Sequence, residues 1–129
     1  MKTRLLVYAI SAILAVSTII AIVISIQEPV ITIVNVDILP GAARADQEEN
    51  LSPKVIKVVI GVNNTIRWNN LDGTPHTLTP DYQYDGFSES IGILKPGESE
   101  ERTFKKLGMF GYHGEPGPWI KGTIIVSEP

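Results

Sequence analysis

The chain has 129 residues and contains no cysteine, two histidines and two methionines. Without a thiol it cannot form a disulfide, a catalytic thiolate, an iron–sulfur cluster, a lipid-modified cysteine or a thiolate-bound copper site. The sequence also lacks a Ser/His/Asp constellation, a phosphate-binding loop and paired carboxylates beside a base. We therefore expect no enzymatic activity.

Charge is absent from residues 5–26, a run of 22 residues near the N-terminus. A helix of this length spans about 33 Å, which is enough to cross a bilayer. The apolar core of a secretory signal is usually about 7–15 residues and ends in a small-x-small cleavage motif. Residues 24–28 contain no such motif. We predict one transmembrane helix that stays attached, with cleavage near residue 27 as the alternative.

Lys2 and Arg4 precede this run and Glu28 follows it. Positive residues collect on the cytoplasmic side of a membrane, so the rest of the chain is predicted to lie on the extracytoplasmic side of the cell membrane. Residues 1–27 then form a cytoplasmic start and an anchor, and residues 28–129 form one domain. Nine of the 11 Lys and Arg residues fall in residues 27–129, against all 14 Asp and Glu, a net charge of −5. This acidic balance argues against a nucleic-acid partner.

The remaining chain alternates short β-branched segments with turn residues, and it shows no convincing amphipathic helix. Gly61 to Asn64 supply turn residues that predict a hairpin between residues 54–60 and 65–68. Residues 37–53 and 80–90 are expected to be loops. The pattern predicts an all-β, Greek-key β-sandwich. We expect strands at residues 30–36, 54–60, 65–68, 91–94, 99–105, 109–113 and 123–126.

Four segments carry a family resemblance that covers about residues 30–129. They are Trp68-Asn69-Asn70, Pro75-His76-Thr77, residues 92–99 (GILKPGES) and residues 111–122 (GYHGEPGPWIKG). In their order and spacing they resemble the cupredoxin family, especially small plastocyanin-like proteins of archaea and bacteria. The resemblance implies the cupredoxin β-sandwich and, in the family, copper-based electron transfer.

The resemblance also implies where the copper ligands of such a site would fall. Family members hold copper with two imidazoles, a thiolate and a weak axial thioether. The first histidine corresponds to His76, the cysteine to Gly114, the second histidine to Gly117 and the methionine to Ile120. Three of the four positions therefore have no donor atom, although Tyr112, Pro118, Trp119 and Gly122 keep their family places.

Two hypotheses follow for function. The first is an accessory or binding module of a membrane or surface complex, with a degenerate copper site and no cofactor. The second is an electron-transfer or copper-handling protein with a non-standard copper or zinc site that includes His76, joined by His113 or Glu115. Alternation along the strand places His113 on the face opposite Gly114, away from His76, unless a bulge reverses it. In the alternative arrangement, His76 is hydrogen-bonded at a loop end and His113 lies on the surface.

The glycines at 114 and 117 have two interpretations. They leave room for a small ligand or a partner's side chain, or they simply allow a tight turn beside two prolines. Tyr112, Pro118 and Trp119 are the candidate partner surface.

Two further expectations concern single side chains. Aromatic area is what a small sandwich most needs to bury, so we expect Trp68, Phe104, Tyr112 and Trp119 to be largely buried. Asn50 and Asn63 match the N-glycosylation pattern in predicted loops.

Overall fold

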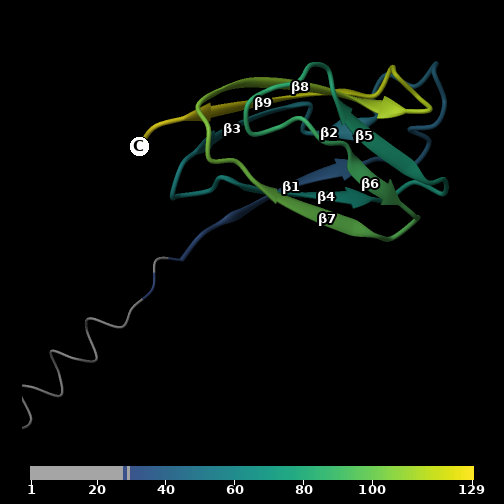
Figure 1. The fold of residues 1–129 in the computed structure, drawn as a ribbon. Coiled ribbons are helices and arrows are strands. Elements are labelled where there is room, and N and C mark those ends of the chain that lie inside the picture. The colour runs from purple at the N-terminus through teal and green to yellow at the C-terminus, as the bar shows by residue number, and fades with distance from the viewer. Residues whose placement is uncertain (1–27, 29) are drawn as a thin grey trace, which may run out of the picture. The chain divides into compact units, whose positions relative to one another are not determined.

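The computed structural model describes residue 28 and residues 30–129. The predicted membrane helix at residues 5–26 and the domain boundary at residue 27 lie outside the described residues. No helix in the described part of the chain is long and apolar enough to cross a membrane. The fold lies in one compact unit, Ile31–Pro129, and is built from strands and loops (Figure 1).

In the described residues nine strands form two sheets, and the all-β prediction for this domain is confirmed. One sheet has the order β2-β1-β4-β7 and the other has the order β3-β9-β8-β5-β6. Each sheet contains one parallel pair, β1 with β4 and β3 with β9, and its other pairs are antiparallel. The strands are β1 Ile33–Ile38, β2 Leu51–Ser52, β3 Val55–Val59, β4 Thr65–Asn70, β5 His76–Pro80, β6 Ile91–Leu94, β7 Ser99–Thr103, β8 Gly108–Glu115 and β9 Lys121–Ser127.

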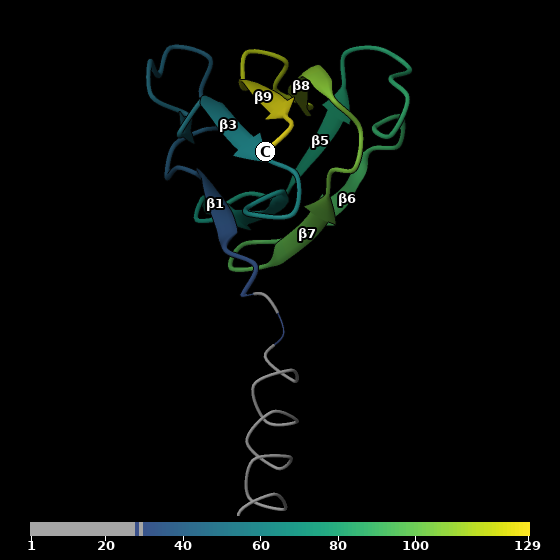
Figure 2. The same ribbon diagram turned by 90° about the vertical axis from the view of Figure 1, so that its left-hand side faces the viewer.

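The core lies between the two sheets because each central strand alternates inward apolar residues with outward polar ones. In β4, for example, Ile66 and Trp68 are fully buried while Arg67 lies on the outer face and pairs with Glu101. Figure 2, viewed nearly along the strands, shows β1 and β7 in one layer and β3, β9, β8 and β5 in the other. Strand β7 has no buried residue, which suits its place at the edge of a sheet.

Aromatic rings fill the centre of the core. Trp68 lies edge-on to Tyr112, with ring centroids 5.8 Å apart, and its Nε1–H donates to the Tyr112 hydroxyl at 3.2 Å. Phe104 and Phe110 pack in the same cluster with centroids 5.5 Å apart. The burial predicted for Trp68, Phe104 and Tyr112 is confirmed. Phe87 also joins this core, although it lies in the loop predicted at residues 80–90.

The predicted hairpin between residues 54–60 and 65–68 is wrong. Strand β3 pairs with β9 and strand β4 pairs with β1 and β7, so the turn carries the chain from one sheet to the other. Asn64 accounts for this crossing, because its Nδ2 donates to the Phe104 carbonyl at 2.7 Å and its Oδ1 accepts from Gly61 N–H at 3.1 Å. The turn is therefore anchored to the segment after β7, and it does not join β3 and β4 as hydrogen-bonded neighbours.

Candidate functional site

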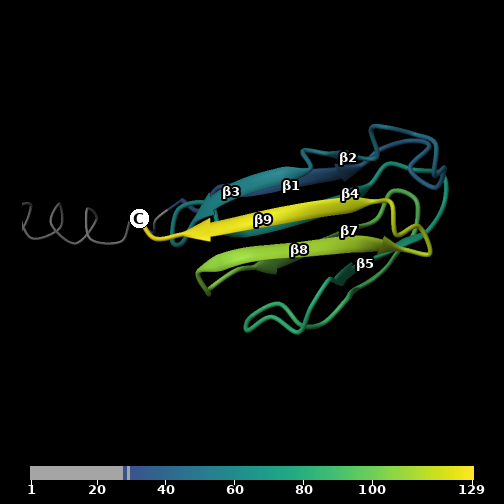
Figure 3. The same ribbon diagram turned by 90° about the horizontal axis from the view of Figure 1, so that it is seen from above.

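The segment between β8 and β9 carries the three positions that correspond to missing copper ligands. Gly114 N–H donates to the Ile120 carbonyl at 2.8 Å, and Ile120 N–H donates to the Gly117 carbonyl at 3.1 Å. The Ile120 side chain is fully buried. The loop between β8 and β9 (Figure 3) thus closes on itself through backbone hydrogen bonds. It places the Ile120 side chain inside the protein.

The two glycines are packed against their neighbours and leave no room. A Cβ at position 114 would lie 2.9 Å from the Gly117 carbonyl oxygen and 2.9 Å from Cβ of Ile120. A Cβ at position 117 would lie 2.9 Å from Cζ2 of Trp119. The space into which a side chain at either position would point is therefore not left open for a small ligand or a partner's side chain. Ile120 and Trp119 already occupy that space.

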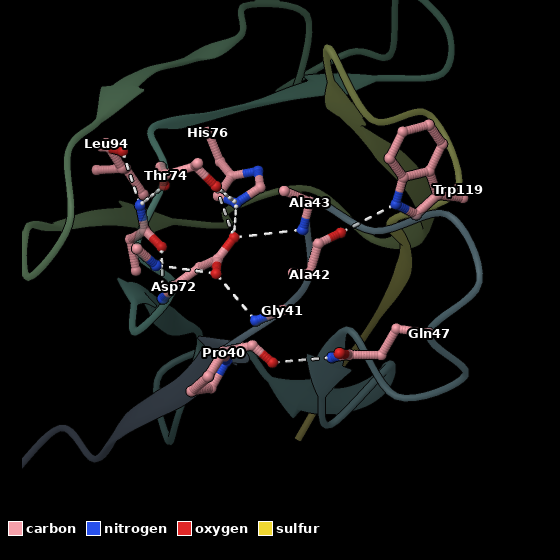
Figure 4. Close-up of polar contacts among 12 residues, drawn as sticks. Pro40, Gly41, Ala42, Ala43, Gln47, Asp72, Thr74, His76, Leu94 and Trp119 are labelled. Atoms are coloured by element: carbon pink, nitrogen blue, oxygen red, sulfur yellow. Dashed lines mark hydrogen bonds and ion pairs between the residues drawn. The ribbon is translucent and has the colours of Figure 1, made fainter.

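His76 is the first residue of β5 and is 2% exposed. Its Nε2 lies 2.7 Å from Oδ2 of Asp72, and its Nδ1 is buried without a hydrogen-bond partner. In Figure 4 this second ring nitrogen points away from Asp72. Because a proton on Nδ1 would find no acceptor, the arrangement favours a neutral ring that donates from Nε2 and keeps a lone pair on Nδ1.

The Asp72 carboxylate accepts several hydrogen bonds. Besides His76, its carboxylate accepts hydrogen bonds from Gly41 N–H at 2.9 Å, Gly73 N–H at 2.9 Å and the Thr74 hydroxyl at 2.7 Å. Burial by itself raises the pKa of Asp72, but the hydrogen bonds from His76, Thr74 and the two backbone N–H groups outweigh it. They hold the pKa of this carboxyl well below its usual range, so Asp72 is ionised.

The segment of residues 40–50, which donates to Asp72, also holds Trp119. The indole Nε1–H of Trp119 donates to the Ala42 carbonyl at 2.9 Å, and Nδ2 of Asn50 donates to the Trp119 carbonyl at 3.4 Å. Residues 40–50 therefore link the His76 end of β5 to the loop between β8 and β9 (Figure 4). Sequence analysis missed Asp72 and this link. The only local signal was an Asp-Gly turn shortly before His76.

The two histidines do not converge. His113 lies on the outer face of β8, with Nδ1 2.6 Å from Asp81 and Nε2 3.6 Å from Glu115. Gly114 and its inward neighbours lie on the buried face, so the predicted orientation of His113 is confirmed. The structure does not bring His76 together with His113 or Glu115. Among residues 30–129, no group of three or more His, Asp or Glu side chains is arranged to hold a metal ion.

The predicted partner surface is corrected in part. Tyr112 is 1% exposed and packs in the core, so it contributes nothing to a surface. Trp119 is 37% exposed, which is more than expected, because its indole N–H is held by Ala42 rather than by the sandwich core. Pro118 and Trp119 line a shallow hollow with Asp81, Tyr82, His113 and Lys121.

Burial also decides one of the two glycosylation predictions. Asn50 is 5% exposed, and its amide donates within the protein. A glycan on this amide has no room, so the Asn50 motif is not accessible in this structure. Asn63 lies in the partly exposed turn after β3, where its Oδ1 accepts from Val59 N–H at 2.7 Å. The Asn63 motif stays a candidate by pattern alone.

Comparison with known proteins decides the family. No family model matches the sequence. A plastocyanin from Scenedesmus fuscus is 33% identical over 79 residues, which cover 54% of this chain and 81% of the plastocyanin. The chain belongs to the cupredoxin family. The likeness thus extends over most of the length of that plastocyanin.

Solved cupredoxins share the fold. A purple cupredoxin from Nitrosopumilus maritimus superposes with a TM-score of 0.63 at 24% identity, over 73% of this chain and 99% of that protein. A Cu(I) form of an amicyanin mutant gives a TM-score of 0.56 at 22% identity, over 73% and 81% of the two chains. A Cu-containing nitrite reductase from Thermus scotoductus SA-01 gives 0.60 at 25% identity, but this chain spans only 24% of it.

The residues present do not fit a blue-copper centre of the cupredoxin kind. His76 does fit one ligand, because a carboxylate on Nε2 and a free lone pair on Nδ1 are typical of a metal-binding imidazole. Gly114, Gly117 and Ile120 supply no donor, and their packing closes the space that donors would need. One imidazole alone lacks the converging ligands on which such sites depend.

Proposed function

We propose that this chain is an extracytoplasmic binding module of the cupredoxin family that has lost its blue-copper site. The observation that carries the proposal is the closed packing at the ligand positions, where Ile120 and Trp119 fill the space beside Gly114 and Gly117. Two glycines without such packing would be compatible with a site that a partner completes. The packing of Ile120 and Trp119 beside the two glycines supports a lost site instead.

The second part of the proposal is that the predicted transmembrane helix at residues 5–26 anchors the module to the membrane. It rests on the uncharged run at residues 5–26 and on Lys2 and Arg4 before it. A module held at the outer side of the cell membrane is suited to a role in a membrane or surface complex. Its acidic charge disfavours nucleic acid as the partner.

One observation favours a second function, in which the chain handles copper through His76. The lone pair on Nδ1 of His76 is buried and free, and Asp72 sets the tautomer of the ring, as in a metal-binding imidazole. A single buried imidazole would bind copper weakly, and it would give no intense blue colour without a thiolate.

Titration of the protein with Cu(II), followed by visible absorption and metal analysis, distinguishes the binding module from the copper-handling protein. We expect no intense blue band and no stoichiometric copper that survives dialysis. His113→Ala is the matched control, because the surface imidazole beside Asp81 and Glu115 is the other group able to take up copper. Tight copper binding that is lost in His76→Ala but kept in His113→Ala would refute the loss of the site and support copper handling.

The triple variant Gly114→Cys, Gly117→His, Ile120→Met tests the packing argument. It supplies the full ligand set, but new Cβ atoms at 114 and 117 meet the Gly117 carbonyl and the Trp119 ring at 2.9 Å. We expect the variant to be destabilised and to stay colourless with Cu(II), because its loop has to move before the ligands converge. A folded triple variant that turns blue would show that the loop keeps an open cupredoxin geometry.

A further inference from the structure

A hollow of about 620 Å³ lies on the outer face of the five-stranded sheet. Its floor is formed by His113 of β8 and Lys121 of β9, which are partners in register. Tyr82, just after β5, forms one wall. Pro118 and Trp119, in the loop between β8 and β9, form another. The hollow is thus lined by two aromatic rings from loops and by polar groups from the sheet.

Both aromatic rings are held in place by the protein. Trp119 has its polar Nε1–H bound to Ala42, so the part of its ring that faces the hollow is apolar. Tyr82 is 72% exposed, and its ring lies edge-on to Tyr84 with centroids 5.7 Å apart. The Tyr84 hydroxyl in turn accepts from Gly111 N–H at 3.1 Å. Rings that are already positioned lose little entropy when a ligand stacks on them.

The charges of the hollow point to a neutral ligand. Asp81 lies 2.6 Å from His113, and Glu115 lies 3.6 Å from the other nitrogen of the same imidazole. Lys121 brings one cation to the lining, so the formal charges of Asp81 and Lys121 cancel and the lining itself selects neither a cation nor an anion. The net charge of −5 on residues 27–129 opposes an anion.

We propose that this hollow binds a neutral saccharide. The apolar faces of a sugar ring would stack on Trp119 and Tyr82, and its hydroxyls would bond to the Lys121 ammonium and the Tyr82 hydroxyl. The inference rests on the proposed binding function and names its ligand class. A proline-rich peptide also docks between aromatic rings, but the polar floor formed by His113 and Lys121 suits hydroxyl groups better than proline rings.

Titrations of the full chain test the proposal with four probes: cellohexaose, xylohexaose, mannohexaose and chitohexaose. Calorimetry measures affinity, and tryptophan fluorescence reports on Trp119. We expect at least one probe to bind saturably. Tyr82→Ala, at a surface position where folding is not at risk, should weaken that binding by about tenfold or more, which is ~1.4 kcal/mol. Ile93→Ala is the control, since Ile93 is 69% exposed on β6 and does not line the hollow.

Three outcomes would overturn the proposal: no saturable binding of any of the four sugars, equal affinity in Tyr82→Ala, or saturation by a decaproline peptide alone. The last result would make the hollow a peptide-binding surface. Each is distinguishable from a failure of the proposed function, because loss of the copper site is measured separately by colour and copper content.

Discussion

Replacing Asp72 by alanine removes a carboxylate that accepts five hydrogen bonds, and we expect a large loss of stability. The donors are backbone N–H groups of residues 41, 43 and 73, the hydroxyl of Thr74 and Nε2 of His76. Residues 73 and 74 are exposed and can bond to water instead. The imidazole of His76 is 2% exposed and cannot.

The size of the expected stability loss follows from the buried imidazole of His76. Removing the acceptor of a buried, neutral imidazole N–H costs about 1–3 kcal/mol, because the donor is left unsatisfied and desolvated. The residue 40–50 segment, which also holds Trp119, loses two of its backbone hydrogen bonds in the same variant. Since a domain of this size is stable by about 5–15 kcal/mol, the loss is a large share of the total.

Urea unfolding monitored by tryptophan fluorescence measures this effect. Asp85→Ala is the control, because Asp85 is 85% exposed and only approaches Lys106 at 3.5 Å. Its effect should stay within about 0.5 kcal/mol. If Asp72→Ala also costs less than about 1 kcal/mol, the pair does not hold this end of the sandwich and the argument fails.

The Asp72 carboxyl also makes the stability of the fold depend on pH in the acid range. Its pKa is lower in the folded protein than in the unfolded chain, so unfolding takes up a proton once the pH falls below the usual Asp value of about 3.9. The stabilisation by Asp72 is therefore complete above that pH and declines as the pH falls further. Asp72→Asn, which cannot ionise, should be less stable at neutral pH and should show a flatter decline between about pH 4 and pH 2.

Four other predictions follow from the core and from the predicted membrane anchor. Trp68→Ala should cost about 3–5 kcal/mol in denaturant unfolding, and a loss below ~1 kcal/mol would contradict its place in the core. Gly122→Ala should destabilise the fold by at least about 1–3 kcal/mol, because a Cβ there overlaps the buried ring of Tyr112; Gly73→Ala, with open space around it, is the control for calorimetry. Burial raises the pKa of Tyr112 to about 12, so its phenol should keep its proton past the usual value of ~10 in an ultraviolet titration, and stability should fall between about pH 10 and pH 12. Protease shaving of intact cells should digest residues 28–129; their survival until lysis would refute the outward orientation.

Sequence by itself determined the features that depend on local periodicity and on side-chain chemistry. Alternation in β4, β8 and β9 shows which residues face inward, because successive side chains of a strand point to opposite faces. It also placed His113 away from the buried face. The absence of donors at Gly114, Gly117 and Ile120 needs no structure, since neither a glycine nor a hydrocarbon side chain coordinates a metal.

Tertiary structure decided what depends on contacts between distant residues. Turn residues at 61–64 indicate where the chain changes direction, but whether β3 joins β4 or β9 is settled by packing across the core. The same holds for Asp72, whose role appears only when residues 40–43 fold over it, and for Asn50, which is buried against the Trp119 loop. A glycine in a sequence shows only that a side chain is missing. Whether the space is empty depends on neighbours such as Ile120 and Trp119, and here they fill it.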